Sequence, residues 1–243
     1  GVVITAGKPA FCGGADLTML ESMRGLYTDM VSKQGEEAGA KMVFDESRKL
    51  SQLYRRIETC GKPWVCALNG TAMGGGFELA LACHYRVASD DAKTRLGLPE
   101  IKIGLFPGAG GTQRVARMLQ PADALQFLLK GDQLKVDRAK AMKLIDAVVP
   151  EADLIKTAKD WIKAGGKAKA PWDAEGFRLP GVAKPADEVS RLHELFFPYY
   201  ADNIAVLSRP FEGIPALLDG LLRAGARLAV CTNKLEGLSR TLL

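Results

Sequence analysis

Three consecutive glycines at positions 74–76 separate a strand pattern from a helix pattern, and they constrain the fold more than any other feature. Residues 64–68 (WVCAL) form a short apolar run that is typical of a buried strand. Residues 77–84 (FELALACH) combine good helix formers with an apolar face. Because glycine permits tight turns and a close approach of other backbone, the sequence predicts a strand, a tight loop and a helix.

Apolar runs and helical periods alternate along most of the chain, which predicts an α/β fold. The glycine-rich segment GKPAFCGGAD, residues 7–16, is expected to be a loop. The expected strands are residues 2–5, 64–68, 84–88 and 95–98, with a short extended piece at 148–149. The expected helices are residues 35–59, 122–129, 138–144 and 152–164, together with those that follow the glycines at 74–76 and at 108–111.

Composition excludes several classes of protein. Among 243 residues, 47% are hydrophobic and 25% are charged, which argues against a disordered or fibrous chain. The sequence has no apolar run long enough to span a membrane, and its net charge of +5 is too mild to indicate nucleic-acid binding. Two histidines and five cysteines without a CxxC pair argue against a metal site and a disulfide scaffold, so a reduced cytoplasmic setting is expected.

Two glutamates follow backbone features that would place them beside a ligand. Glu78 falls in the first turn of the helix after the glycines, where free amides gather positive potential. Glu100 follows a proline at an expected strand-to-loop junction. Two carboxylates in different environments can divide acid and base work. Taken alone, the favoured interpretations are an ordinary first-turn acid for Glu78 and a solvated turn residue for Glu100, because exposed glutamates are common.

The glycine-rich segment GAGGTQ, residues 108–113, is only superficially similar to a dinucleotide-binding fingerprint. Gln113 stands where the third glycine is required, and no suitable strand precedes the segment. We therefore expect no nicotinamide cofactor, and no other cofactor is indicated. The glycines of residues 13–14 and 74–76 could instead aim backbone amides at a developing oxyanion.

Three strings together resemble the crotonase, or enoyl-CoA hydratase/isomerase, superfamily. They are FCGGADL, KPWVCALNGTAMGGGFELALAC and AKTRLGLPEIKIGLFPGAGGTQRVARML. The resemblance extends over about residues 1–181 and is strongest to the hydratase portion of multifunctional fatty-acid oxidation enzymes. It implies a crotonase-like spiral of ββα units in residues 1–165, followed by a linker at 166–182. The first strands of that fold are expected to be missing, so the domain would be truncated at its N-terminus.

The resemblance also implies site residues and a reaction. The amides of Ala15 and Gly75 would form an oxyanion hole for an acyl-CoA thioester, which is substrate rather than cofactor. Glu78 and Glu100 would be the catalytic pair that hydrates trans-2-enoyl-CoA to 3-hydroxyacyl-CoA. Further substrate contacts would come from Gly14, Asp16 and Gly74. Isomerisation of the double bond is the alternative, and a homotrimer or hexamer is implied for the assembly.

Residues 183–243 resemble an interior piece of a haloacid-dehalogenase-type phosphatase, most similar to phosphoglycolate phosphatases. The strand RLAVCTN, which ends with Thr232 and Asn233, carries this likeness. A phosphatase would need an aspartyl nucleophile in a DxDx[TV] strand, and the chain contains no such string. Two alternatives to the hydratase therefore stay open, which are a phosphatase and an inactive chimeric fragment.

Overall fold

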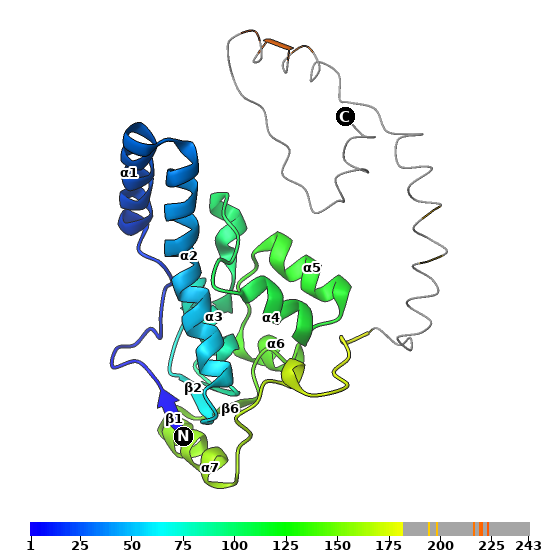
Figure 1. Ribbon diagram of the computed structural model, residues 1–243. Coiled ribbons are helices and arrows are strands. Elements are labelled where there is room, and N and C mark those ends of the chain that lie inside the picture. Colours follow the sequence, from blue (N-terminus) through cyan, green and yellow to red (C-terminus); the bar gives the residue numbers. More distant parts are fainter. Residues whose placement is uncertain (182–193, 195–197, 199–215, 217–218, 221–222, 224–243) are drawn as a thin grey trace. The chain divides into compact units, whose positions relative to one another are not determined.

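Figure 1 shows the computed structural model of the chain, which describes residues 1–181 together with residues 194, 198, 216, 219, 220 and 223. Its contacts divide it into two compact units, Gly1–Val182 and Ala183–Leu243. Every site residue predicted from the sequence lies in the first unit, which is described below. The phosphatase-like segment predicted at 183–243, including Thr232 and Asn233, lies outside the described residues and stays a prediction.

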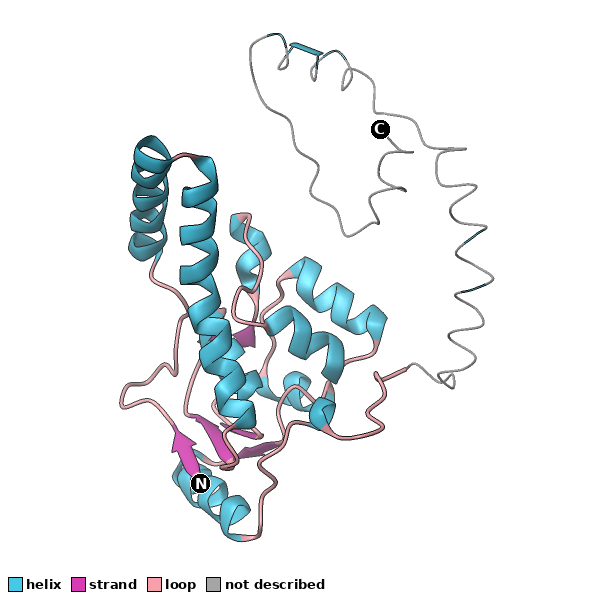
Figure 2. Ribbon diagram, in the orientation of Figure 1, coloured by secondary structure: helices cyan, strands magenta, loops and turns pink. Residues whose placement is uncertain are grey.

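The larger sheet of the first unit is entirely parallel (Figure 2). Its register places Val2 opposite Trp64 and Val87 opposite Ala147. Parallel neighbours need long crossover connections, and here these connections carry the helices. The strands, in spatial order, are β1 (Val2–Ile4), β2 (Trp64–Leu68), β4 (Tyr85–Ser89) and β6 (Ala147–Val149). The predicted α/β fold is confirmed, and the structure shows that its larger sheet is parallel.

Alternating side chains of this sheet enter two different cores, as expected for a strand buried on both faces. Val65 and Ala67 pack against helix α7 (Leu154–Lys163), which lies beside β1 in Figure 1. Cys66 and Leu68 face the opposite way, into the larger core, to which the helices from α2 to α6 contribute side chains. The apolar run of residues 64–68 is therefore explained by burial on both sides.

A second, smaller sheet positions the predicted site. It pairs β3 (Ala72–Met73) in parallel with β5 (Leu96–Gly97). Cys12 extends this sheet through a parallel bridge to Ala72, and Leu134 extends it through an antiparallel bridge to Leu96. Segments that are far apart in the sequence are thereby brought side by side.

Seven α-helices and three 3-10 helices occupy the described part of the chain. Helix α1 packs along α2, and a Cβ at Gly39 of α2 would lie 2.5 Å from Val31, so this glycine permits the close approach. The helices not yet bounded are α1 (Leu17–Gln34), α2 (Glu36–Thr59), α3 (Gly75–Ala82), α4 (Gly111–Met118), α5 (Pro121–Lys130), α6 (Val136–Ala141), η1 (Pro99–Ile103), η2 (Glu151–Asp153) and η3 (Pro171–Asp173).

Most predicted elements are confirmed, and three differences have physical reasons. No element is predicted from the sequence between the glycine-rich loop and residue 35, and helix α1 fills that stretch. The apolar residues of α1 do not gather into a clear stripe along the sequence, and one of them, Leu26, is 58% exposed. The helix predicted at 138–144 ends early, at Ala141, and Lys143 adopts a φ of 61°. Residue 100 lies in η1 and not at a strand-to-loop junction.

Candidate active site

Three segments that carry the predicted site leave the smaller sheet at one edge. Residues 13–16 follow Cys12, residues 74–78 follow β3, and residues 98–100 follow β5. Because these extended segments run parallel, their carboxyl ends meet at the same edge, where α/β proteins commonly place their ligands. The three strings that carry the family resemblance therefore converge in space.

Glycines let the first two segments touch. Gly14 has a φ of 101°, and a Cβ there would lie 3.0 Å from the Met73 carbonyl oxygen and 3.5 Å from the Gly75 amide nitrogen. A Cβ at Gly76 would lie only 2.5 Å from Cys12 Cβ. Any larger residue at either position would push the two loops apart.

Glu78 is held from one side in a nearly closed environment. It lies in the first turn of α3 and is 2% exposed. Its Oε1 accepts hydrogen bonds from the amides of Ala109 and Gly111, at 2.8 and 2.7 Å. Burial raises the pKa of its carboxyl, while the two amides and the charge of Arg114 act in the opposite direction. The other oxygen, Oε2, lies 4.0 Å from where a Cβ of Gly75 would be, so it faces the glycine loop.

Glu100 reaches the same loop from η1. Its Oε1 would lie 3.2 Å from a Cβ at Gly74, and its buried Oε2 has no hydrogen-bond partner among the described residues. Burial raises the pKa of its carboxyl, and the neighbouring charge of Glu78 raises it further. The two carboxylates thus border adjacent glycines and sense each other electrostatically.

The two amides that the resemblance assigns to an oxyanion hole are free to donate. Within the described part of the chain, neither the Ala15 amide nor the Gly75 amide has a hydrogen-bond acceptor. The Gly74 amide is occupied, because it donates to the Gly97 carbonyl at 3.0 Å. The helix α3 begins at Gly75, and the dipole at a helix start favours negative charge nearby.

The remaining predicted contacts are placed as follows. Asp16 is the N-cap of α1, where its carboxylate accepts a hydrogen bond from the Thr18 amide at 2.9 Å. The Thr18 hydroxyl donates to the same carboxylate at 2.8 Å, and the hydrogen bonds from this hydroxyl and from the amide lower the pKa of Asp16. Gly14 and Gly74 both lie in the convergent loops described above. The structure therefore brings Gly14, Gly74, Glu78 and Glu100 together, while the Asp16 carboxylate has a capping role.

Several residues of this site could not be identified from the sequence. The segment at 108–111 supplies two amides to Glu78, although the sequence suggested only a false dinucleotide fingerprint. Tyr54 of α2 donates its hydroxyl proton to the Gly75 carbonyl at 2.9 Å, and burial raises its pKa to about 12. Arg114 of α4 contacts the Ala109 carbonyl at 2.8 Å. The glycine run at the start of α4 is the sequence signal that could have indicated the amides of residues 109 and 111.

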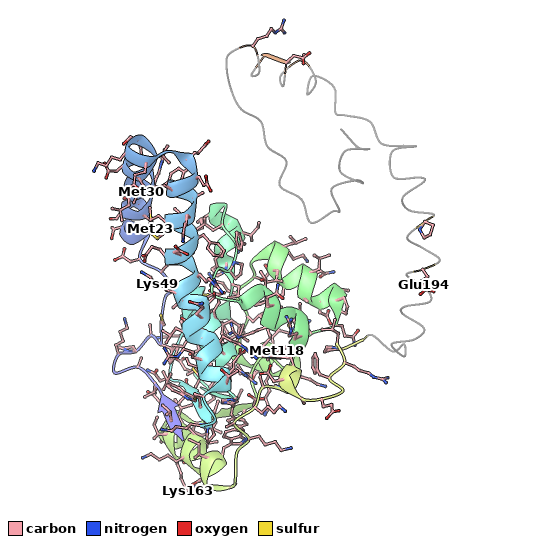
Figure 3. The ribbon with its side chains drawn as sticks, viewed as in Figure 1. Met23, Met30, Lys49, Met118, Lys163 and Glu194 are labelled. Atoms are coloured by element: carbon pink, nitrogen blue, oxygen red, sulfur yellow. The ribbon has the colours of Figure 1, made fainter. Side chains whose placement is uncertain are left out.

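Helices α2 and α4 both contact α3, through Tyr54 and Gly111 respectively. In Figure 3 the label Lys49 identifies α2 and the label Met118 identifies α4. Among the residues that the structure describes, no group of three or more His, Cys, Asp or Glu side chains has an arrangement suited to a metal ion. No described helix combines the length and the apolar character needed to cross a membrane.

The chain is similar to two curated proteins named fatty acid oxidation complex subunit alpha. The protein from Shewanella loihica is 42% identical over 173 residues, and the one from Vibrio vulnificus is 38% identical over 169 residues. These matches cover 70% and 69% of this chain. The chain spans 22% of the length of each of these relatives.

A solved structure of an enoyl-CoA hydratase from Thermoplasma volcanium is 25% identical, with a TM-score of 0.58. That match covers 91% of this chain and 77% of the solved one. The profile of the enoyl-CoA hydratase/isomerase family matches residues 1–170. With this match over more than half of its length, the chain belongs to the enoyl-CoA hydratase/isomerase family.

Proposed function

We propose that the first unit binds an acyl-CoA thioester and adds water to trans-2-enoyl-CoA, which gives 3-hydroxyacyl-CoA in fatty-acid oxidation. One observation carries the proposal, namely that the carboxylates of Glu78 and Glu100 border the adjacent glycines Gly75 and Gly74. Membership of the family supports it, as does the similarity to proteins named fatty acid oxidation complex subunit alpha.

The free amides of Ala15 and Gly75 are the groups that would bind the thioester carbonyl oxygen. Two donors aimed at this oxygen stabilise the negative charge that develops as the thioester becomes an enolate. The N-terminus of α3 adds a favourable dipole at the same place. Gly14 and Gly74 would shape the loops around the carbonyl, and Asp16 would act through its cap of α1.

The two glutamates would handle the protons of one water molecule. The water oxygen forms a bond to the β carbon, and a proton is delivered to the α carbon as the enolate collapses. Glu78 offers Oε2, since its Oε1 is held by two amides, and Glu100 offers an oxygen without a partner among the described residues. Burial raises the pKa of both carboxyls toward neutral pH. A group whose pKa lies near the working pH can both accept and donate a proton efficiently.

The reaction as proposed needs no cofactor, because acyl-CoA is itself the substrate. A homotrimer or hexamer and a cytoplasmic location accompany the proposal by family resemblance. Isomerisation of a double bond is the second candidate, since the partner-free carboxylate of Glu100 could move a proton between two carbons by itself. The presence of a second carboxylate, Glu78, beside the same loop favours hydration.

The test follows the loss of ultraviolet absorbance of a conjugated enoyl-CoA thioester. Glu100→Gln is expected to lower kcat by roughly 10²- to 10⁴-fold, the usual worth of a positioned acid or base. The matched control is Glu151→Gln, because Glu151 also follows a proline at the start of a 3-10 helix but is exposed. Unchanged turnover in Glu100→Gln would contradict the proposal.

Two further results separate the alternatives in the same assay. Conversion of a 3-enoyl-CoA to the conjugated isomer, without hydration, would replace the hydratase by the isomerase. A chain without turnover whose thermal transition is raised by acyl-CoA would support a binding fragment.

A further inference from the structure

A buried ion pair between α2 and α4 has no part in the proposed chemistry. Arg114 is 5% exposed and Glu58 is 3% exposed, and Arg114 Nε donates to Glu58 Oε1 at 2.7 Å. Burial of two charges is costly, and a buried ion pair is often no more stabilising than apolar residues of the same size. The pair therefore calls for an explanation other than stability.

The same guanidinium also contacts the turn at residues 109–111, whose amides bind Glu78. Arg114 Nη1 donates to the Ala109 carbonyl at 2.8 Å. Gly110 has a φ of 95°, and a Cβ there would lie 2.6 Å from Nη1, so the arginine lies directly against the turn. The Ala109 and Gly111 amides on either side of this turn both donate to Glu78 Oε1. Arg114 and Glu78 thus bind the same residue, Ala109, through its carbonyl and its amide.

Glu58 is itself fixed in place by a second arginine. Its Oε2 accepts a hydrogen bond from Arg55 Nη1 at 2.9 Å. Arg55 in turn makes two hydrogen bonds to the Asp173 carboxylate in η3, at 2.8 and 2.6 Å. These contacts leave Glu58 little freedom, so it presents a fixed acceptor to Arg114.

We propose that Arg114, oriented by Glu58, is a positioning residue for Glu78. By fixing the turn at residues 109–111, it makes both amides hold a single oxygen of Glu78, and this leaves Oε2 directed toward the glycine loop. Such preorganisation matters because a small misplacement of a reacting group costs a large part of the rate. The proposal rests on the proposed function only for its kinetic part.

Charged and titratable groups reach Glu78 from three elements. Arg114 comes from α4, Tyr54 from α2 and Glu100 from η1. Arg114 lowers the pKa of Glu78, whereas the negative charge of Glu78 raises the pKa of both Tyr54 and Glu100. Loss of Arg114 removes a favourable charge and loosens two amide donors, so both effects move the pKa of Glu78 upward.

The experiment compares Arg114→Met and Arg114→Lys with Arg86→Met in the full chain. Arg86 is the matched control, because it is also buried, pairs with Asp146 at 2.8 Å and donates to the Cys83 carbonyl. Titration of the Glu78 carboxyl is followed by ¹³C NMR without substrate, with Glu78→Gln identifying the signal. In parallel, kcat, KM and the pH profile of kcat/KM are measured with an enoyl-CoA.

For Arg114→Met we expect the Glu78 titration and the acid limb of the profile to move to higher pH. We also expect kcat to fall by about 10- to 100-fold, with KM changed far less. Arg114→Lys should give a smaller shift, since its ammonium keeps the charge but cannot reach both partners in the same fork. Arg86→Met should leave the titration of Glu78 unchanged.

An unchanged Glu78 titration in Arg114→Met, or an equal shift in Arg86→Met, overturns the proposal. If Arg114→Met does not fold, Arg114→Lys takes its place, and an unchanged titration in that variant has the same meaning. If the wild-type chain turns over no enoyl-CoA while Arg114→Met alone shifts the titration, the positioning role stands and the proposed hydratase activity falls.

Discussion

The two glutamates of the candidate site differ in how the protein surrounds them. Glu78 is enclosed between α3 and α4, with one oxygen fixed by two amides and an arginine behind them. Glu100 is the second residue of a short 3-10 helix, and its Oε2 has no partner among the described residues. The run that follows it leaves large apolar side chains exposed, and Phe106 is 75% exposed.

This contrast shows how one side-chain type acquires two behaviours. Burial raises the pKa of both carboxyls. At Glu78 two amides of the turn at 109–111 and the charge of Arg114 counteract burial, whereas at Glu100 only its own backbone amide does so. At Glu100 the charge of Glu78 acts in the same direction as burial. One environment therefore fixes a carboxylate in place, while the other leaves a carboxyl oxygen free to meet a ligand.

The largest difference between the two environments should be in packing. Phe77, next to Glu78, is fully buried, so Phe77→Ala should lower the free energy of unfolding by about 3–5 kcal/mol. The matched change Phe106→Ala should alter it by less than about 0.5 kcal/mol. Urea unfolding followed by tryptophan fluorescence measures both, because all three tryptophans, Trp64, Trp161 and Trp172, lie in the first unit. Equal effects would show that the two environments are equally packed.

The glycine beside Glu100 should be the next most sensitive position. Gly74 has a φ of 51°, so Gly74→Ala should cost about 1–3 kcal/mol in backbone strain. Its Cβ would also lie 3.2 Å from Glu100 Oε1 and would displace this carboxylate. We therefore expect kcat/KM to fall even under conditions in which the variant is fully folded. Gly13→Ala is the control, because a Cβ there meets nothing within 4 Å. A Gly74→Ala protein with normal activity would show that Glu100 does not depend on this loop.

The smallest expected effect is the stability of Glu78→Gln. The amide oxygen can still accept both hydrogen bonds, but the buried charge is gone. Because folding raises the pKa of Glu78 above 4.5, this group favours the folded state below that pH, and the contribution is lost as pH rises through the folded pKa.

At pH 7, Glu78→Gln should therefore have a higher free energy of unfolding than the wild type, because it lacks the buried charge. Near pH 4 the two proteins should be equally stable. Urea unfolding at both pH values, with Glu151→Gln as the exposed control, measures the difference. A variant that is less stable by the same amount at both values would show that the ionised carboxylate costs nothing in this environment.

Local patterns were sufficient to predict most of the fold. The strand at 64–68 and the helix after the glycines were predicted because burial and periodicity leave clear traces in short windows. Helix α1 left a weaker trace, since it depends on its packing along α2 and on caps at Asp16 and Gly35. An Asp before the helix and a glycine after it were the only local signals.

For the site, the sequence could predict residues but not their partners. Glu78 was predicted from the glycine run that precedes it, and the structure places Glu100 beside the same loop. The amides that hold Glu78 come from more than thirty residues away, and Arg114, which contacts the same turn, is paired with Glu58 of another helix. Contacts of this kind depend on the register of the folded chain, and no local pattern encodes them.

The parallel order of the larger sheet has a consequence for the time course of folding. Its strand pairs join distant segments, since Val2 pairs with Trp64 and Val87 pairs with Ala147. Long loops must close before such pairs contribute any stability, and folds of this kind form slowly. Helices α1 and α2 are neighbours in the chain and can associate early. The loop at residues 13–16 follows Cys12, whose bridge to Ala72 also joins distant segments, so regain of activity should lag behind regain of helix.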